Sequence, residues 1–298
     1  MVRLADAVSA NNAADCTGKT ALVVGGTSGC GKGLALVLAR QGCTVVIIGR
    51  NVDRGAIAAR EIQTASPTNL ECKFISCDVR SFAEIKKTCS ELSAAHPRID
   101  FISVSSTRGP SARHIAGITP TDEGFDERLM MMYLGRWAWV HALLPNLNRS
   151  DDPRVISILS AGKHSSHKHW ETDFLTAKCS VSGRTFACGF YNDCACEALC
   201  KLQPKLTAVH IFPGFVNTNW WMELPWGMRC LTKLLMRTAK SVEDCGEWMA
   251  YPLLNPKFAS GPFACTEHAE PEQWTKLQST ACEGVWAKSV QVFERHLG

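Results

Sequence analysis

A glycine-rich loop between an apolar strand and a helix restricts the fold of this chain more than any other feature. Residues 20–24 form a short apolar run, Gly25, Gly29 and Gly31 follow it, and an apolar helical stretch begins at Leu34. Glycines at this junction permit a tight turn and let backbone N–H groups approach a pyrophosphate at the helix N-terminus. The loop therefore predicts a βαβ unit that binds a dinucleotide.

Strands and helices alternate along the rest of the chain. Further short apolar runs predict strands at 44–48, 73–77, 101–104, 155–159 and 208–212, and the amphipathic stretches between them predict helices, the longest at 123–147 and 186–202. This alternation indicates a parallel sheet covered on both faces. We predict an α/β fold: a Rossmann-type doubly wound parallel sheet in a single domain over residues 16–298, after a mobile N-terminal tail over residues 1–15.

The composition argues against several classes of protein. With 46% hydrophobic residues the chain can bury a large core, and its net charge of +4 comes with no basic run interleaved with aromatics. Nucleic acid is therefore not an expected partner. The cysteines are dispersed, no secretory signal precedes them, and no window approaches the roughly 18 apolar residues of a membrane span. We expect a cytoplasmic protein with reduced thiols and no integral membrane segment.

The glycine spacing resembles that of the short-chain dehydrogenase/reductase family, and the resemblance extends over roughly residues 18–298. Asp78, at the end of the third strand, resembles the family's adenine-contacting aspartate. Pro213-Gly214, with Val216 and Thr218, resembles the segment beside the nicotinamide. The loop and the resemblance together imply a nicotinamide cofactor held by Gly25, Thr27, Ser28, Gly29, Cys30, Gly31, Arg50, Asn51, Asp78, Val79, Ser105, Pro213, Gly214 and Val216.

The end of the second strand distinguishes NADP from NAD. NAD-binding members place a carboxylate there for the ribose 2′-hydroxyl, and that carboxylate would repel a 2′-phosphate. Here the strand ends in Gly49-Arg50-Asn51, and a guanidinium can bind a phosphate through two hydrogen bonds. Asp53, the one acid nearby, is expected to cap the next helix. The predicted cofactor is therefore NADP(H).

The family's catalytic residues are only partly present. The resemblance implies that Ser160, after the fifth strand, polarises a substrate carbonyl, while a Tyr protonates it and a Lys on the same helix holds the ribose. Counting back from the Pro-Gly segment, the Tyr and Lys positions hold Arg184 and Cys188. Counting forward from Ser160 gives Phe174 and Lys178 instead. The residues after Lys178 would interrupt a helix, so we expect it on a surface loop.

Two further departures lie on the same face of the cofactor. Met132 stands at the position of the family's relay asparagine, and residues 105–108 replace the asparagine-rich segment after the fourth strand. These losses beside a retained Ser160 indicate a rebuilt site rather than a decayed one.

The helix around Tyr133 offers replacements for the missing pair. It resembles a helix of a divergent, mainly fungal branch of the family, many of whose members resemble tailoring enzymes of natural-product pathways. That resemblance implies two catalytic substitutes: Arg136, to orient the cofactor or stabilise an oxyanion, and Asp173, to supply a proton or anchor a basic substrate. Tyr133 and Tyr191 are further candidates. The alternatives are an ion pair for Arg136, a turn cap for Asp173 and ordinary packing for the tyrosines.

Three histidines, His164, His167 and His169, crowd the loop after the serine. A solvated loop is one interpretation and a metal site another, and we predict no metal. Because an imidazole titrates near neutrality, a third interpretation is that one of them supplies the missing general acid.

The segment after the sixth strand is expected to cover the substrate as a lid over about residues 215–240. Trp220, Trp221 and Trp226 lie in it, and residues 130–132 and Trp137 are expected across from them. So much apolar surface indicates a large apolar substrate, aromatic or terpenoid in kind. Membrane-surface association and core packing are the alternatives.

These observations predict an NADP(H)-dependent reductase of a bulky apolar carbonyl, imine or enone, acting in secondary metabolism with a non-standard catalytic site. Two alternatives remain open: a non-redox cyclase or isomerase that keeps the cofactor site as scaffold, and an NADP-binding protein without catalysis. Association into a homo-oligomer is left open as well.

Overall fold

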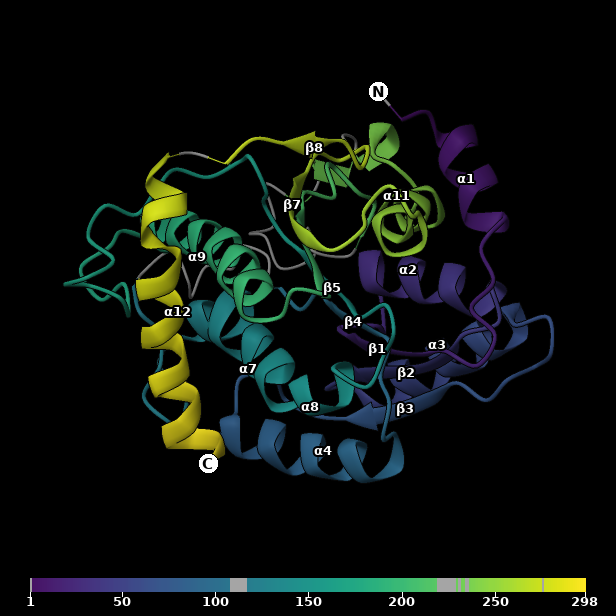
Figure 1. Ribbon diagram of the computed structural model, residues 1–298, viewed down its shortest axis with the longest axis horizontal. Helices are drawn as coiled ribbons and strands as arrows, with labels where there is room; N and C mark the ends of the chain where they lie inside the picture. Colours follow the sequence, from purple (N-terminus) through teal and green to yellow (C-terminus); the bar gives the residue numbers. More distant parts are fainter. Residues whose placement is uncertain (1, 108–116, 219–228, 230–231, 234–235, 275) are drawn as a thin grey trace.

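The computed structural model describes residues 2–107, 117–218, 229, 232–233, 236–274 and 276–298, and within them one eight-stranded sheet forms the centre of the molecule (Figure 1). The strands are β1 (Thr20–Val24), β2 (Thr44–Gly49), β3 (Lys73–Ser76), β4 (Phe101–Val104), β5 (Arg154–Ile158), β6 (Thr207–Ile211), β7 (Gly261–Cys265) and β8 (Pro271–Glu272). Their order is β3-β2-β1-β4-β5-β6-β7-β8, and every neighbouring pair is parallel except β7 with β8. The order reverses between β1 and β4, which is where open α/β sheets bind ligands.

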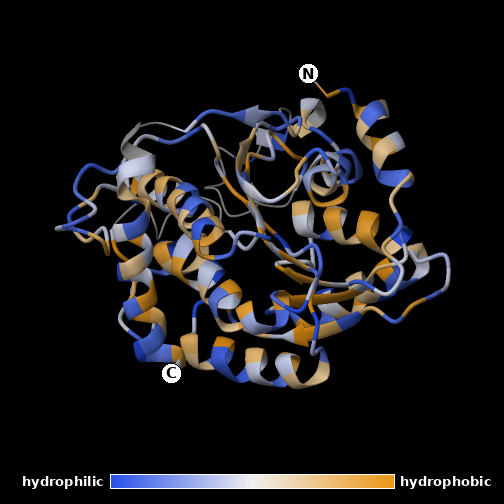
Figure 2. Cartoon of the chain, in the orientation of Figure 1, coloured by the Kyte–Doolittle hydropathy of each residue, from blue (hydrophilic) through white to orange (hydrophobic). Residues whose placement is uncertain are grey.

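Helices cover both faces of the sheet, as the predicted Rossmann-type fold requires. One face packs against α2 (Gly29–Arg40), α3 (Val52–Ala65) and α11 (Val242–Leu254); the other packs against α4 (Phe82–Ala95), α7 (Gly135–Ala142), α9 (Val181–Leu202) and α12 (Lys276–Leu297). Every residue of β4, β5 and β6 is buried. This double coverage explains why the strands are continuous apolar runs, seen in orange at the centre of Figure 2.

The long helix predicted over 123–147 is instead a series of shorter elements: α6 (Glu127–Leu129), a π-helical turn (Met130–Leu134), α7 and α8 (Leu144–Leu147). A π-helical turn changes the regular hydrogen bonding of a helix. Here Asn192 of α9 reaches across and donates from Nδ2 to the carbonyl oxygen of Met132 at 2.8 Å. The break therefore depends on a partner from a distant helix.

Helices α2 and α11 meet backbone to backbone. A Cβ atom on Gly33 would lie 2.3 Å from the carbonyl oxygen of Val242, and one on Gly246 would lie 2.5 Å from the carbonyl carbon of Gly33. Neither position has room for a side chain. The crossing therefore fixes α2, whose first residues follow the glycine loop.

The first fifteen residues, expected as a mobile tail, instead contain a docked helix, α1 (Leu4–Asn12). Asn11 is fully buried against α11 and donates from Nδ2 to Glu247 Oε2 at 2.8 Å. Glu247 also pairs with Arg40 of α2. These polar contacts hold α1 against α11. Their partners lie far along the chain, so the local sequence of the first fifteen residues does not predict them.

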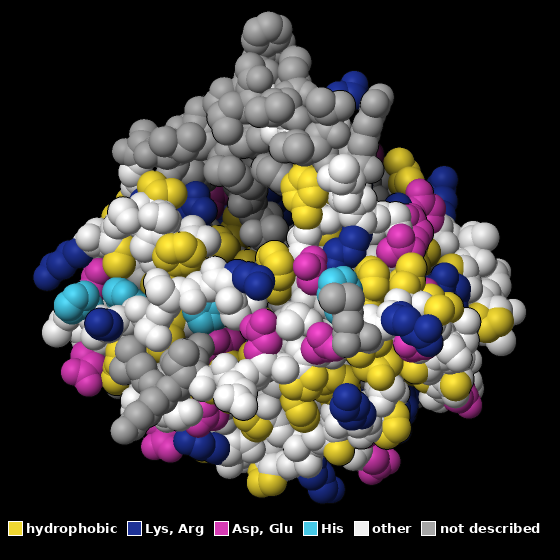
Figure 3. Space-filling model, turned by 90° about the horizontal axis from the view of Figure 1, so that it is seen from above, with side chains coloured by type: hydrophobic (Ala, Val, Ile, Leu, Met, Phe, Trp, Pro, Cys, Tyr) yellow, Lys and Arg dark blue, Asp and Glu magenta, His cyan; other side chains and the backbone are white. Residues whose placement is uncertain are grey.

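The C-terminal helix α12 runs alongside α9 and ends beside α4 (Figure 1), where the ring of His296 stacks on Phe82 with centroids 4.9 Å apart. Within the described residues, none of the helices has the length and apolar character needed to cross a bilayer. Lys and Arg side chains are interspersed with Asp and Glu on the face shown in Figure 3.

Candidate functional site

The glycine loop forms a cradle at the point where the strand order reverses. Gly25 has a φ of +88°, and a Cβ atom on Gly31 would lie 2.5 Å from the Gly25 carbonyl oxygen and 2.4 Å from Ser105 Oγ. Ser105, at the end of β4, donates from Oγ to the carbonyl of Val24 or Gly25, at 3.2 or 3.3 Å. The loop can therefore adopt this conformation only because glycines leave room at these positions, and the Ser105 side chain of the neighbouring strand end holds it in place.

The N-terminus of α2 leaves its first amide groups available. Ser28 occupies the N-cap position in an extended conformation, and its side chain makes no capping hydrogen bond. Gly29, with φ of +56°, approaches Thr218 so closely that a Cβ atom would lie 3.0 Å from Thr218 Cγ2. Uncapped amides and the helix dipole favour an anion at this point. The cradle thus fits the pyrophosphate of a dinucleotide.

Two other predicted loop residues border this cradle. Thr27 packs beside the end of β2, where a Cβ atom on Gly49 would lie 2.7 Å from Thr27 Cγ2. Cys30 is half-buried, and a hydrogen bond with the thiol of Cys245 lowers its pKa.

The end of β2 presents Arg50 as predicted. Its side chain is 42% exposed, and Nη1 lies 3.9 Å from Asp78 Oδ2. Arg80 holds the same carboxylate from Nε and Nη2. Burial raises the pKa of Asp78, but the hydrogen bonds with Arg80 outweigh it, and the pKa lies below its ordinary value. Among the described residues, Arg50 has only this long contact to an acid, and its half-exposed guanidinium could bind a ligand.

Asn51 and Val79 have structural roles that the sequence did not predict. The Asn51 side chain caps α3 by accepting from the Arg54 amide at 2.7 Å, so the helix cap is Asn51 and not Asp53. Val79 is buried, and its carbonyl oxygen lies where a Cβ atom on Gly135 would come within 2.4 Å.

The Pro213-Gly214 segment is held by Lys240, just before α11, and by Glu267, just after β7. Gly214 has a φ of +74°, and a Cβ atom there would overlap the Glu267 carboxylate. Lys240 pairs with Glu267 at 3.0 Å, and its backbone bonds to the residues on both sides of Val216. The segment therefore keeps one conformation at the carboxyl end of β6.

Ser160 lies directly after β5 on the same edge of the sheet. Its backbone N–H donates to His210 Nε2 at 3.1 Å. Its Oγ is buried and has no hydrogen-bond partner among the described residues. The hydroxyl therefore has its hydrogen-bonding capacity unused within the described part of the chain.

Neither of the two residues that the count back from Pro213-Gly214 predicts at the family's Tyr and Lys positions is placed to act chemically. Arg184 donates to the carbonyl oxygens of Cys179 and Gly117, and so holds two loops. Cys188 is fully buried, and burial raises the pKa of its thiol to about 12. Lys178 is exposed before the Ser180 cap of α9, on a loop as expected.

Arg136 is not placed to contact a ligand. Its side chain is buried, and all three guanidinium nitrogens are bonded: Nε to Met131 O, Nη1 to Val104 O, Ser157 Oγ and Ile158 O, and Nη2 to Ser106 O. Desolvation lowers its pKa to about 9. Arg136 ties the ends of β4 and β5 together, so neither predicted role, substrate contact nor ion pair, describes it.

The other predicted substitutes are also held by structural contacts. Tyr133 shares a 2.6 Å hydrogen bond with Ser289, and Tyr191 donates to the Phe174 carbonyl at 3.1 Å. Both tyrosines are fully buried. Asp173 accepts from the Lys178 amide at 3.2 Å, which is the turn cap that was the alternative.

The predicted substrate wall lies partly in the core. Residues 130–132 are buried, and Trp137 donates from Nε1 to Asn192 at 3.0 Å with its ring edge against Trp286. Trp220, Trp221 and Trp226 of the predicted lid lie outside the described residues.

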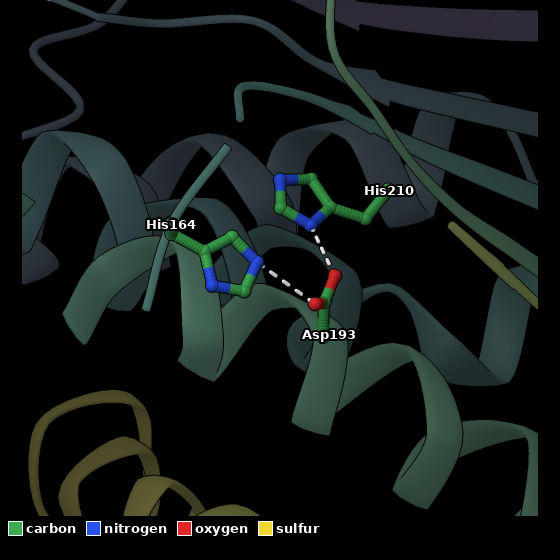
Figure 4. Close-up of side chains that lie close together, drawn as sticks. All are labelled: His164, Asp193 and His210. Atoms are coloured by element: carbon green, nitrogen blue, oxygen red, sulfur yellow. Dashed lines mark hydrogen bonds and ion pairs between the residues drawn. The ribbon is translucent and has the colours of Figure 1, made fainter. Parts of the chain in front are cut away.

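Sequence reasoning missed a buried polar cluster behind Ser160, formed by His164, Asp193 and His210 (Figure 4). It also missed Asn192, whose Oδ1 accepts from Ser157 Oγ at 2.6 Å. The available signal was a polar residue inside an otherwise apolar strand, as at His210, because such residues are rarely buried without a partner.

The fold and this edge of the sheet define a Rossmann-type, dinucleotide-binding class of protein. The family model for short chain dehydrogenase matches residues 19–226, and the chain belongs to that family. An oxidoreductase of Emericella nidulans is 30% identical over 208 residues, which cover 67% of this chain and 59% of that protein. The match thus spans less than two thirds of this relative.

Two further proteins extend the comparison. Polyprenol dehydrogenase of Homo sapiens is 23% identical over 286 residues, covering 92% of this chain and 84% of that protein. The structure of an alcohol dehydrogenase from Thermococcus sibiricus, complexed with 5-hydroxy-NADP, has a TM-score of 0.61 and 17% identity, covering 86% and 99% of the two chains. The structural likeness concerns the fold alone.

Proposed function

We propose that this protein is an NADP(H)-dependent oxidoreductase that reduces a bulky apolar carbonyl, imine or enone with a non-standard catalytic site. The observation that carries the proposal is the Ser160 hydroxyl, buried and without a partner among the described residues, on the edge of the sheet that holds the glycine cradle. A buried polar group left unpaired is unfavourable by about 1–3 kcal/mol. A ligand oxygen or nitrogen at this point would remove that penalty.

The chemistry divides between the cofactor and the chain. When bound, NADPH supplies the hydride. Ser160 donates its Oγ–H to the substrate oxygen and stabilises the negative charge that develops there. Gly25, Gly29 and Gly31 bring backbone amides to the pyrophosphate, and Arg50 binds the 2′-phosphate.

The proposed substrate class has two supports. One relative is named for a polyprenol, which is a long isoprenoid alcohol, and this agrees with a terpenoid substrate. Phe215, beside the Pro213-Gly214 segment, is 40% exposed and offers apolar surface at the site. The fungal relative and the resemblance to natural-product enzymes support a role in secondary metabolism.

Fluorescence titration with NADPH and NADH tests the cofactor assignment. We expect Arg50→Glu to weaken NADPH binding about 10- to 100-fold, since a hydrogen-bonded charge pair contributes about 1.5–3 kcal/mol, and to change NADH binding far less. Arg60→Glu, on the exposed face of α3, is the matched control. Equal losses for both cofactors would show that Arg50 does not read the phosphate, and no binding of either would end the proposal.

A further inference from the structure

Behind Ser160, three side chains from separate elements meet around one carboxylate. His164, in the loop after β5, and His210, on β6, lie on either side of Asp193 of α9 (Figure 4). Asp193 Oδ2 is 2.8 Å from His164 Nε2, and Oδ1 is 2.5 Å from His210 Nδ1. The side chains are at most 3% exposed. Burial raises the pKa of Asp193, but the two imidazoles lower it further, so it lies below its ordinary value and the carboxylate is charged.

The hydrogen bond from the Ser160 backbone fixes the protonation of His210. The Ser160 N–H donates to Nε2, so Nε2 carries the lone pair and Nδ1 carries the proton that it donates to Asp193. Burial lowers the pKa of His210, which agrees with a neutral ring. His210 therefore orients Asp193 and links it to the backbone of Ser160.

His164 has one nitrogen in use and one to spare. Its Nε2–H donates to Asp193, and its Nδ1 is buried without a hydrogen-bond partner in the described part of the chain. Ser160 Oγ is likewise buried and has no hydrogen-bond partner among the described residues. The serine hydroxyl and the His164 ring border one point on α9: a Cβ atom on Gly189 would lie 2.7 Å from Ser160 Oγ, 2.6 Å from His164 Cδ2 and 2.7 Å from His164 Cγ. The missing side chain of Gly189 lets the serine and the imidazole approach each other.

The same three side chains are of types that bind metal ions, and their ligand atoms lie within 4.8 Å of one another. Two ligands about 2.0–2.1 Å from a tetrahedral zinc ion are roughly 3.3 Å apart. The contacts of 2.5 and 2.8 Å are too short for that arrangement and fit hydrogen bonds. His210 Nδ1 also carries a proton where a metal would need a lone pair.

We propose that His164, held by Asp193, delivers protons through Ser160 and so replaces the missing tyrosine. This inference rests on the proposed reductase function. Once a hydride has added to the substrate carbon, the C=O π electrons become a lone pair on oxygen. Ser160 Oγ passes its proton to that oxygen, and protonated His164 passes its Nδ1 proton to Ser160 Oγ through one water molecule, since the two atoms are not hydrogen-bonded to each other. Asp193 stabilises the imidazolium before transfer, the neutral imidazole remains afterwards, and solvent returns the proton.

The test uses the full chain with NADPH and the isoprenoid aldehydes retinal and farnesal as probes. We expect His164→Gln to lower kcat by about 100- to 1,000-fold, in the range of general acid catalysis, with the KM of the aldehyde and the Kd of NADPH changed less than about twofold. Asp193→Asn is expected to act in the same direction. His169→Gln, an exposed histidine of the same loop, is the matched control and is expected to keep full activity.

Two further measurements separate a proton relay from a structural role. Added imidazole is expected to restore part of kcat in His164→Ala, which a lost packing contact would not allow. Gly189→Ala keeps all three side chains of the cluster but puts a methyl group within 2.7 Å of both Ser160 Oγ and the His164 ring, so the two must move apart and we expect a similar fall in kcat. Alanine favours a helix over glycine, so this variant is expected to fold. Gly183→Ala, in the first turn of α9, is its control.

The outcomes distinguish the relay from the function on which it rests. A wild-type protein that reduces the probes, with His164→Gln and Gly189→Ala equally active, overturns the relay and leaves the reductase standing. Loss of NADPH binding in His164→Gln, failure of imidazole to rescue, or a stoichiometric zinc ion in the purified protein also overturns the relay. A wild-type protein that binds NADPH but reduces neither probe overturns the proposed function itself.

Discussion

The cofactor half and the catalytic half of this site follow different rules. The cradle around Gly25, Gly29 and Gly31 consists of backbone and of space that a Cβ atom would fill. The proposed catalytic half consists of side chains, and there Arg184 and Cys188, which the sequence predicts at the positions of the family pair, are buried in structural contacts. A site formed by backbone groups can be predicted from the spacing of glycines. A site formed by side chains can be assembled from residues that are distant in the sequence, so local spacing does not predict it.

Of the substitutions that test this difference between the two halves, one at Arg136 is expected to have the largest effect. If it holds the strand ends and does no chemistry, Arg136→Met leaves several buried carbonyls unpaired and should lower the free energy of unfolding by about 3–5 kcal/mol. Urea denaturation measures this change, with Arg60→Met as an exposed control. If Arg136→Met keeps the wild-type free energy of unfolding but has a strongly lowered kcat, Arg136 takes part in catalysis.

The second test concerns the glycine cradle of the cofactor half. Gly31→Ala puts a methyl group against the Gly25 carbonyl and Ser105 Oγ, and overpacking of this kind is unfavourable by about 1–3 kcal/mol. We expect the Kd of NADPH to rise about 10- to 100-fold. Fluorescence titration measures it, with Gly183→Ala as control. An unchanged Kd would mean that the cradle does not bind the pyrophosphate.

The smallest effect concerns the pH dependence of stability. Because burial lowers the pKa of His210, the unfolded chain takes up the proton first as pH falls. The stability from neutral His210 is therefore complete above its unfolded pKa of about 6.5 and is lost as pH falls below it, by up to about 1.4 kcal/mol per pH unit. We expect His210→Gln to flatten the stability profile on the acid side of neutrality. His169→Gln should retain the wild-type slope, and identical slopes in both variants would contradict a neutral, buried His210.

The sequence predicted those parts of the fold that depend on local pattern. The parallel sheet followed from apolar runs, and the glycine loop and Ser160 followed from their places at strand ends. The docking of α1 was not predictable, because Asn11 finds its partner at Glu247 in α11. The break at Met130–Leu134 was missed for the same reason, since Asn192 supports it from α9.

The catalytic candidates show the same limit. Arg136 and Asp173 were predicted from the resemblance to a divergent branch of the family, and Tyr133 and Tyr191 from their places on the helices near the site. Sequence alone cannot tell which way a buried side chain points. The cluster of His164, Asp193 and His210 is assembled from a loop, a helix and a strand. The sequence marked one member, His164, as one of three candidate acids in its loop. His210, a polar residue in an apolar strand, was a second signal that went unused.

The glycine-to-glycine crossing of α2 and α11 has a consequence for how such a protein can diverge. Gly33 and Gly246 bring the two helix backbones into contact. At this crossing the distance between the helices is set by backbone atoms and does not depend on the size of any side chain. A larger residue at either glycine would push the two helices apart. Such a change would move the start of α2 and the glycine loop before it, although neither glycine need touch a ligand.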